Sequence, residues 1–356
     1  MKPLPLFTLF LSTAAFLQVN AQKASQGMNT IQVIGSHNSY KNAIEPALFE
    51  VLQAKDSTHK ALNGLQYAHI PISDQLDMGL RNLEIDIYAD SKGGKYAHPK
   101  GLDLAKPDQP YDPAGVMNKP GFKVFHVIDI DFRSSSLTFE DCLQKLKAWS
   151  DAHPGHTPIF ITLEPKDGKV NRFGTTPEMF TPQLFDESDA VIRKVLGNDK
   201  LITPDMVRGN YSTLEEAVLH NNWPKLEKAN GRFLFILDDS NKKRDMYMQG
   251  HPSLKGRVVF VNAAPGTPEA AALLRNNPED TTIPELVKKG YLIRTRADAD
   301  TKEARANDYT RFDNARKSGA QIISTDYYLP SKFFDSPYQV KFDDGKYVRV
   351  NPVNGK

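Results

Sequence analysis

The segment IQVIGSHNSY, residues 31–40, places polar side chains directly after a short apolar run. The run is mostly β-branched, which predicts a buried strand that ends at Gly35. His37 and Asn38 then stand side by side at the end of this strand. An imidazole can move a proton near neutral pH, and an amide oxygen can ligate a hard cation. The pair therefore indicates a reactive site, whose partners must come from other segments.

Acidic side chains occur at the ends of two further apolar segments. Glu84 and Asp86 are two residues apart in the segment 82–89, so they face the same side of a strand. Glu164 ends another such segment. Three carboxylates and an amide form a hard-oxygen ligand set, which suits Ca²⁺ or Mg²⁺ better than Zn²⁺. An ion pair of the first two carboxylates with Arg81 is the simpler alternative.

A second histidine, His126, lies in the apolar segment 123–129. Two histidines from separate segments fit an acid–base pair on opposite sides of a reacting group better than joint ligation of one ion. The alternative for His126 is a structural role in the core. His153 and His156 lie between a predicted helix and the next strand, so they belong to the opposite end of the fold and are expected to be structural.

Basic side chains accompany these groups. Lys166 lies two residues after an acidic strand end, and Arg294 and Arg296 share one side of a further segment. Two arginines and a lysine would neutralise a phosphate group. Asp326 ends the last apolar segment. Pairing of the two arginines with Asp298 is the alternative to phosphate binding.

Eight short apolar segments of the strand type follow one another along the chain, with helical patterns between several of them. They are residues 31–35, 82–89, 123–129, 158–165, 232–239, 257–263, 291–298 and 321–328. This alternation predicts an α/β fold, a parallel (β/α)8 barrel of the TIM type, in which the carboxyl ends of the strands bring the polar side chains together. An open doubly wound sheet of this length would more often split into two domains.

Helices are predicted at residues 138–153, 186–197, 267–277 and 302–319. Two other segments depart from the repeating pattern. Residues 90–122 are a long insertion rich in Pro, Gly, Lys and Tyr, which would overhang the mouth of the barrel. Residues 338–350 predict a C-terminal β-hairpin with an Asp-Gly turn, an appendage to the barrel.

The chain has 356 residues, and its 45 basic and 43 acidic residues give a net charge of +2, which argues against nucleic acid as the main partner. Residues 1–21 have the pattern of a secretory signal peptide. Residues 22–356 would then be a single exported domain, periplasmic or extracellular. Its one cysteine, Cys142, excludes an intrachain disulfide. No later segment is apolar enough to predict a transmembrane span.

The segments GSHNSY, QLDMGLRNLEIDIY, VFHVID and FITLEPKD resemble the catalytic X-region of phosphoinositide-specific phospholipases C. LIRTRADADTKEARAND and SGAQIISTDYY are similar to the secreted, Ca²⁺-dependent bacterial-type branch. The resemblance extends over residues 30–352. It implies a TIM-type barrel that cleaves phosphatidylinositol-type lipids with Ca²⁺ as cofactor. The inositol 2-hydroxyl would attack phosphorus, releasing diacylglycerol and inositol (cyclic) phosphate.

By this resemblance, His37 and His126 are the catalytic histidines. The implied calcium ligands are Asn38, Glu84, Asp86 and Glu164. The expected head-group or phosphate contacts are Lys166, Arg294, Arg296 and Asp326. The base is either His37 or a metal-bound carboxylate.

The implied partner is an inositol phospholipid at a membrane or micelle surface, and no protein partner is implied. Two alternatives remain. A glycerophosphodiester phosphodiesterase would act on deacylated head groups, but its usual His-Arg-Gly opening is replaced here by the residues from Gly35 to Asn38. A non-catalytic secreted barrel that binds lipids or head groups is disfavoured because both histidines are present.

Overall fold

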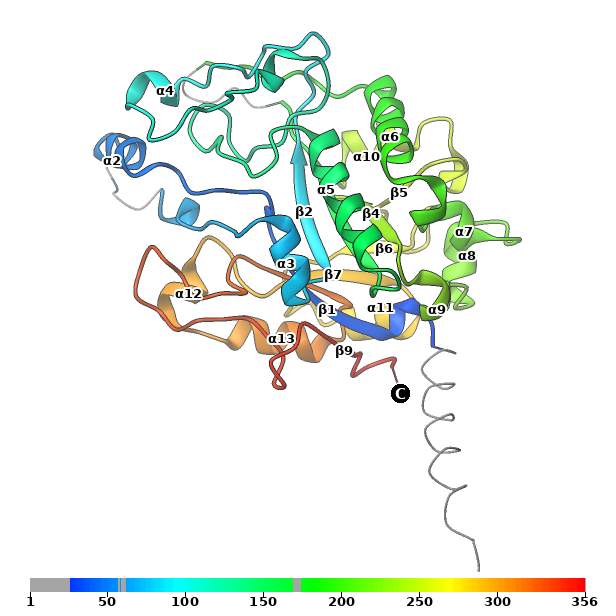
Figure 1. Ribbon diagram of the computed structural model, residues 1–356. Coiled ribbons are helices and arrows are strands. Elements are labelled where there is room, and N and C mark those ends of the chain that lie inside the picture. Colours follow the sequence, from blue (N-terminus) through cyan, green and yellow to red (C-terminus); the bar gives the residue numbers. More distant parts are fainter. Residues whose placement is uncertain (1–25, 57, 59–61, 169–173, 356) are drawn as a thin grey trace, which may run out of the picture.

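The computed structural model describes residues 26–56, 58, 62–168 and 174–355. Eight parallel strands form a nearly closed barrel in the order β5-β4-β3-β2-β1-β8-β7-β6 (Figure 1). They are β1 (Ile31–Ser36), β2 (Asn82–Ile87), β3 (Ile159–Pro165), β4 (Phe233–Leu237), β5 (Val259–Val261), β6 (Ala272–Leu274), β7 (Leu292–Arg296) and β8 (Ile322–Thr325). An isolated bridge between Asn262 and Ala272 joins β5 to β6. The predicted (β/α)8 fold class is thereby confirmed.

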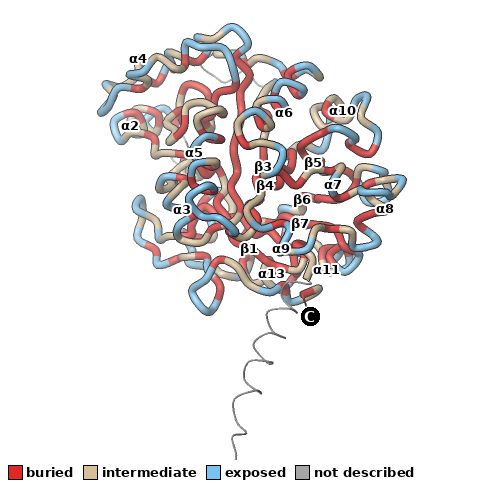
Figure 2. Tube along the Cα trace, turned by 45° about the vertical axis from the view of Figure 1, so that its right-hand side comes forward, coloured by how far each residue is buried: buried red, intermediate tan, exposed pale blue. Residues whose placement is uncertain are grey.

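Helices surround the barrel, and α5 packs between α3 and α6 on its outer side (Figure 1). The α-helices are α2 (Pro46–Ala54), α3 (Ile72–Met78), α4 (Gly101–Leu104), α5 (Phe139–Ala152), α6 (Pro182–Leu196), α7 (Pro204–Arg208), α8 (Leu214–Leu219), α9 (Leu226–Ala229), α10 (Lys242–Met248), α11 (Ile283–Lys288), α12 (Lys302–Ala306) and α13 (Thr310–Ser318). Short 3-10 turns occupy Met28–Thr30, Asn63–Leu65, Val116–Asn118, Asn198–Lys200 and Pro252–Leu254. Figure 2 shows that the strands form the buried interior, whereas the outer faces of the helices and the loops are exposed.

Local signals explain where several predicted helices begin and end. The Thr138 hydroxyl accepts a hydrogen bond from the Asp141 amide and so caps α5. Helix α6 ends at Gly197, whose φ of 84° suits glycine. The pattern over 302–319 forms two helices, α12 and α13, because the chain turns at Asn307 with a φ of 51°.

Residues 123–129 are not the barrel strand that their apolar character predicted. They lie in the long connection from 88 to 138 between β2 and α5, where Lys123 forms bridges with Tyr88 and Thr138. Phe125 is buried and stacks on Tyr88 with ring centroids 4.2 Å apart. The segment is therefore apolar because it packs inside this connection, which contains the predicted insertion.

The predicted helix over 267–277 was also wrong, since β6 occupies its centre. Alanine and leucine favour helices intrinsically, but these residues pair with β7 in the register Ala272 to Leu292 and are buried. Tertiary packing overrides the propensity here, so β6 supplies the eighth strand next to β7, while β2 pairs directly with β3 where 123–129 was expected.

The C-terminal segment keeps the predicted turn but not the full hairpin. Residues 342–346 form the turn, with a 2.9 Å hydrogen bond from the Phe342 amide to the Lys346 carbonyl. The following strand β9 (Val348–Val350) pairs antiparallel with β1 instead of with the first predicted arm. The appendage therefore extends the sheet at the start of β1.

Gly35 fixes how closely β1 approaches β2. It pairs with Asn82, and a side-chain Cβ at Gly35 would lie 2.1 Å from the Asn82 carbonyl oxygen. Beyond this contact, the Ser39 amide donates to the Glu84 carbonyl at 2.9 Å, and the Glu84 amide donates to the Ser39 hydroxyl at 2.8 Å. Glycine thus lets the segment after β1 lie directly against the carboxylates of β2.

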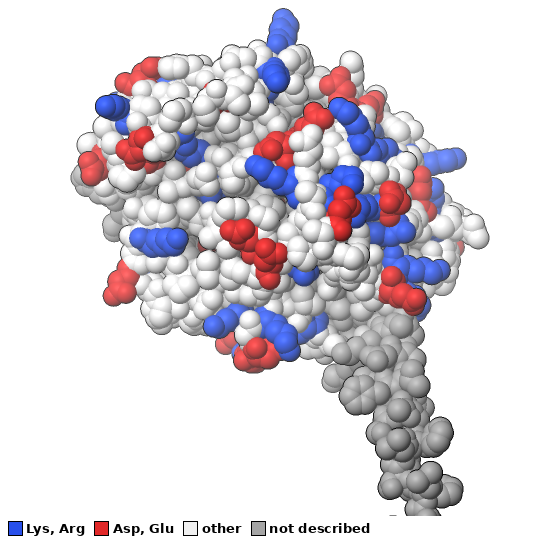
Figure 3. All heavy atoms as spheres, viewed as in Figure 1, with Lys and Arg blue, Asp and Glu red and all other residues white. Residues whose placement is uncertain are grey.

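Basic and acidic side chains are interspersed over the face seen in Figure 3, in keeping with the small net charge. Among the described residues, no helix has both the length and the apolar character needed to cross a membrane. The predicted signal peptide, residues 1–21, lies outside the part of the chain that the structure describes.

Candidate active site

The ten residues singled out in the sequence lie at the carboxyl-terminal side of the barrel. Nine of them belong to barrel strands or follow directly after them: His37, Asn38, Glu84, Asp86, Glu164, Lys166, Arg294, Arg296 and Asp326. His126 comes instead from the long connection after β2. The site is therefore built by five strands and one ordered loop.

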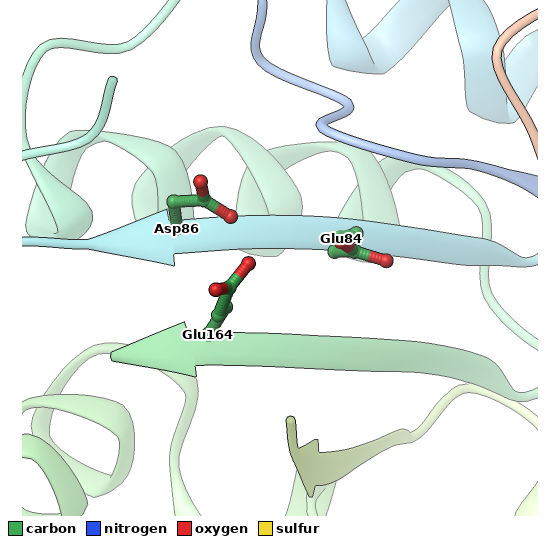
Figure 4. A group of neighbouring side chains, drawn as sticks. All are labelled: Glu84, Asp86 and Glu164. Carbon is green, nitrogen blue, oxygen red and sulfur yellow. The ribbon is translucent and has the colours of Figure 1, made fainter. Parts of the chain in front are cut away.

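Three carboxylates form an acidic cluster, which consists of Glu84, Asp86 and Glu164. One oxygen of each lies within 4.8 Å of the others. Asp86 and Glu164 occupy paired positions on β2 and β3, and their side chains face each other in Figure 4. Burial raises the pKa of Asp86 well above its usual range and raises that of Glu84 to about 7, because desolvation disfavours the charged form.

The acidic cluster has the chemistry of a divalent cation site. The fully buried Asp86 carboxylate lies beside the neutral Tyr40 hydroxyl and receives no backbone amide from the described residues. Glu84 and Asp86 are buried and Glu164 is partly exposed, and carboxylates that converge in this way repel one another unless positive charge offsets theirs. Tyr40 links Asn38 to the acidic cluster: its hydroxyl donates to the Asn38 amide oxygen at 3.3 Å, and burial and then the neighbouring Asp86 carboxylate raise its pKa. Three carboxylates with a neighbouring amide thus fit a hard cation such as Ca²⁺.

Each ring nitrogen of His37 lies against a different carboxylate. Its Nδ1 lies 2.8 Å from Asp326, and its Nε2 lies 3.3 Å from Glu84. Burial, together with the Arg296 guanidinium, lowers the pKa of His37 to about 3 against the opposing effect of Asp326. The Asp326 carboxylate can only accept at Nδ1, so it favours the tautomer with the proton there and leaves Nε2, which faces Glu84, as the nitrogen for proton exchange.

His126 is held by the buried Asp131, which in turn is paired with the buried Lys41. Its Nδ1 lies 2.7 Å from Asp131, whose other oxygen is 3.3 Å from the Lys41 ammonium. Lys41 is completely buried and also donates to the Tyr67 carbonyl at 2.7 Å. The Tyr88 hydroxyl donates to the His126 carbonyl at 2.9 Å. These bonds fix a histidine that no barrel strand supports.

Tyr67 lies between the two histidines. Its ring centroid is 6.1 Å from that of His37 and 6.4 Å from that of His126. Its hydroxyl accepts a 2.7 Å hydrogen bond from the amide of Asn38. The two imidazoles, although they come from different parts of the fold, therefore adjoin the same Tyr67 ring, so both lie in the same part of the site.

The two arginines are bound to acidic groups of the site. Arg294 is buried and pairs with Glu84, and its guanidinium also lies 3.9 Å from Asp238. Arg296 lies 3.6 Å from Asp326 and donates to the backbone carbonyl of Asp298 at 3.0 Å. The arginines thus adjoin both the acidic cluster and the His37–Asp326 pair.

Sequence reasoning missed Lys41, Tyr67 and His69. His69 has Nε2 2.7 Å from the carbonyl oxygen of His37, and its ring stacks on Tyr328 at 5.3 Å. These residues lie in the connection between β1 and β2, and no strand pattern marks it. The isolated YAH sequence around His69 offered too weak a signal to find them.

The histidines assigned to the opposite end have structural contacts there, as predicted. His153 stacks on Trp149 with ring centroids 4.2 Å apart. His156 lies 2.8 Å from the Ser150 hydroxyl. Neither residue contacts the site.

Comparisons with known proteins agree with this architecture. A family model described as "Phosphoinositide phospholipase C, Ca2+-dependent" matches residues 27–352. The fold is similar to a calcium-dependent phosphoinositol-specific phospholipase C from a Pseudomonas species, with a TM-score of 0.54 and 18% identity over 93% of this chain and 97% of that one. It is also similar to a Ca²⁺-dependent phosphatidylinositol-specific phospholipase C from Streptomyces antibioticus, with a TM-score of 0.51 and 22% identity over 86% of this chain and 96% of that one. No curated protein matches the sequence.

Proposed function

Since the chain belongs to the family of Ca²⁺-dependent phosphoinositide phospholipases C, we propose that it cleaves phosphatidylinositol-type lipids into diacylglycerol and inositol phosphate. The observation that carries this proposal is that two separately held histidines adjoin the same Tyr67 ring and that one of them, His37, also lies against Glu84 of the acidic cluster. An acid, a base and a cation site are the groups that phosphodiester cleavage requires.

The residues that would hold Ca²⁺ are Glu84, Asp86 and Glu164, with Asn38 as the neutral ligand. When bound, the ion lowers the pKa of the attacking hydroxyl and neutralises negative charge that develops on phosphorus. The close spacing of the three carboxylates, of which Glu84 and Asp86 are buried, supports this assignment, since their negative charges repel one another.

The two histidines divide the proton transfers. His37 takes the proton of the inositol 2-hydroxyl at Nε2, because its Nδ1 is committed to Asp326. Glu84, 3.3 Å from the same Nε2, is the alternative base. His126 protonates the departing glycerol oxygen, and Asp131 holds its ring for that step. Each carboxylate partner fixes a tautomer and favours the protonated ring when it forms.

The basic residues would contact the anionic substrate. Arg296, at the His37–Asp326 pair, and Lys166, at the acidic cluster, are proposed to contact the phosphate or the head group. Arg294 and Asp326 are the two other residues proposed to contact the head group or the phosphate. The natural substrate would lie in a membrane or micelle, which an exported protein meets outside the cytoplasm.

The proposal is tested with phosphatidylinositol vesicles incubated with the protein in Ca²⁺ or in excess chelator. Diacylglycerol and inositol phosphate should form together in Ca²⁺ and not in chelator. Phosphatidylcholine vesicles are the matched control and should stay intact. Glycerophosphoinositol distinguishes the alternative activity: its cleavage without cleavage of the intact lipid would replace the proposal with a glycerophosphodiesterase.

A further inference from the structure

The Lys166 ammonium lies inside the acidic cluster. It is 3.2 Å from a carboxylate oxygen of Asp86 and 3.2 Å from one of Glu164. The third carboxylate, Glu84, is paired with Arg294. Every carboxylate of the acidic cluster therefore faces a positive charge that belongs to the chain itself.

The Lys166 side chain can move its ammonium without a change in the backbone. Its backbone amide donates to the Ile87 carbonyl at 2.8 Å, which anchors the residue between β2 and β3. The side chain beyond this anchor is a flexible stem with a compact ammonium, and 24% of it is exposed. The ammonium can thus leave the carboxylates while the backbone stays in place.

Asp86 shows why some cation must be present. The carboxylate is fully buried beside the neutral Tyr40 hydroxyl, and no backbone amide of the described residues donates to either of its oxygens. A buried carboxylate without such donors depends on a nearby positive charge. In this structure that charge is Lys166, 3.2 Å away.

We infer that Lys166 is an internal counter-cation of the acidic cluster, which Ca²⁺ must displace in order to bind. The inference rests on the proposed function, because it takes the acidic cluster as the calcium site. An ion ligated by the oxygens that hold the ammonium meets a like charge on the same ligands. Lys166 therefore weakens calcium binding. When Ca²⁺ displaces the Lys166 ammonium from the carboxylates, the ammonium becomes available to contact the substrate phosphate.

The test is calorimetric titration of the metal-free protein with Ca²⁺ alone at about pH 8.5, where protons compete least for the ligands. Lys166→Met should bind Ca²⁺ about tenfold more tightly than the unchanged protein, because the competing charge is gone. Lys166→Arg keeps the charge and should stay within about threefold of the unchanged protein.

Lys243→Met is the matched control. Lys243 lies at the end of β3, where it donates to the Pro165 carbonyl, 3.3 Å from Asp167 and 3.6 Å from Asp239, with a similar exposed fraction of 19%. Its removal changes the net charge equally but takes no cation from the acidic cluster. The calcium affinity of Lys243→Met should equal that of the unchanged protein. If it rose as much as that of Lys166→Met, the gain would come from the change in net charge alone, and the inference would be overturned.

Thermal unfolding gives a second measurement. Lys166→Met should melt lower than the unchanged protein without metal, and Ca²⁺ should raise its melting temperature by more. If this variant does not fold, Lys166→Gln is titrated in its place. An equal or weaker calcium affinity would refute the counter-cation. If the unchanged protein binds no Ca²⁺ at all, it is the metal site of the proposed function that fails.

Discussion

The imidazole of His37 and the carboxylate of Asp326 form a hydrogen-bonded pair, with Nδ1 and Oδ1 2.8 Å apart. The pair joins the end of β1 to the end of β8, which are neighbours in the barrel. Asp326 is itself positioned by Asp298, whose carboxylate accepts its backbone amide at 2.8 Å. These contacts thus hold one nitrogen of His37 against Asp326 and direct the other toward Glu84.

Asp326→Asn should lower the rate of phosphatidylinositol cleavage by about 10²–10⁴-fold, because an amide can donate to Nδ1 and so favour the wrong tautomer. The rate is measured with Ca²⁺ on lipid vesicles, and circular dichroism checks the fold. Asp335→Asn, an exposed change in the loop that follows β8, is the control and should keep full activity. Equal activity of the two variants would remove Asp326 from the mechanism.

Loss of either catalytic histidine should abolish most activity without unfolding the protein. His37→Ala and His126→Ala should each lose about 10²–10⁴-fold, the usual contribution of a general acid or base. His153→Ala, at the opposite end of the barrel, should be nearly silent, since His153 is exposed and its contacts there are with Trp149 and Asp77. If His153→Ala lost as much activity as His126→Ala, the reactive end of the barrel would not be the one proposed.

Lys41→Met should destabilise the fold as well as the site. The substitution leaves Asp131 and the carbonyl of Tyr67 buried without their cation, and breaking a buried pair costs about 3–5 kcal/mol. Urea unfolding measures the free energy. Lys147→Met, which removes an exposed partner of Asp151, is the matched control and should leave stability unchanged. Similar unfolding midpoints for both variants would show that Lys41 does not hold the His126 loop.

The sequence predicted the barrel and the grouping of the site residues, because parallel strands all bring their carboxyl ends to one side. That rule places Asp86 near Glu164 without any knowledge of the register between β2 and β3. It failed for His126, which reaches the site from a loop. Phe125, next to it, is apolar because it packs on Tyr88, and burial in a loop gives the same pattern as burial in a strand.

Short or weakly patterned segments could not be predicted. Ala272 lies in a window of good helix formers, and only its neighbours β5 and β7 make it a strand. Lys41 and His69 lie in a connection without periodicity, so their contacts follow from tertiary structure alone. The ion pairs of Lys166 and Arg294 with the acidic cluster likewise depend on distances that residue types do not give.

Phosphorus NMR of an early time course, with Ca²⁺ and phosphatidylinositol, tests the account most directly. The 2-hydroxyl of the inositol is cis to the phosphate on carbon 1, so its attack is intramolecular and gains the advantage of proximity. We predict that inositol 1,2-cyclic phosphate appears first and that a 2-deoxy-inositol lipid stays uncleaved. Only acyclic phosphate at the earliest times, together with ready cleavage of the 2-deoxy lipid, would contradict the proposed use of His37, His126 and the acidic cluster.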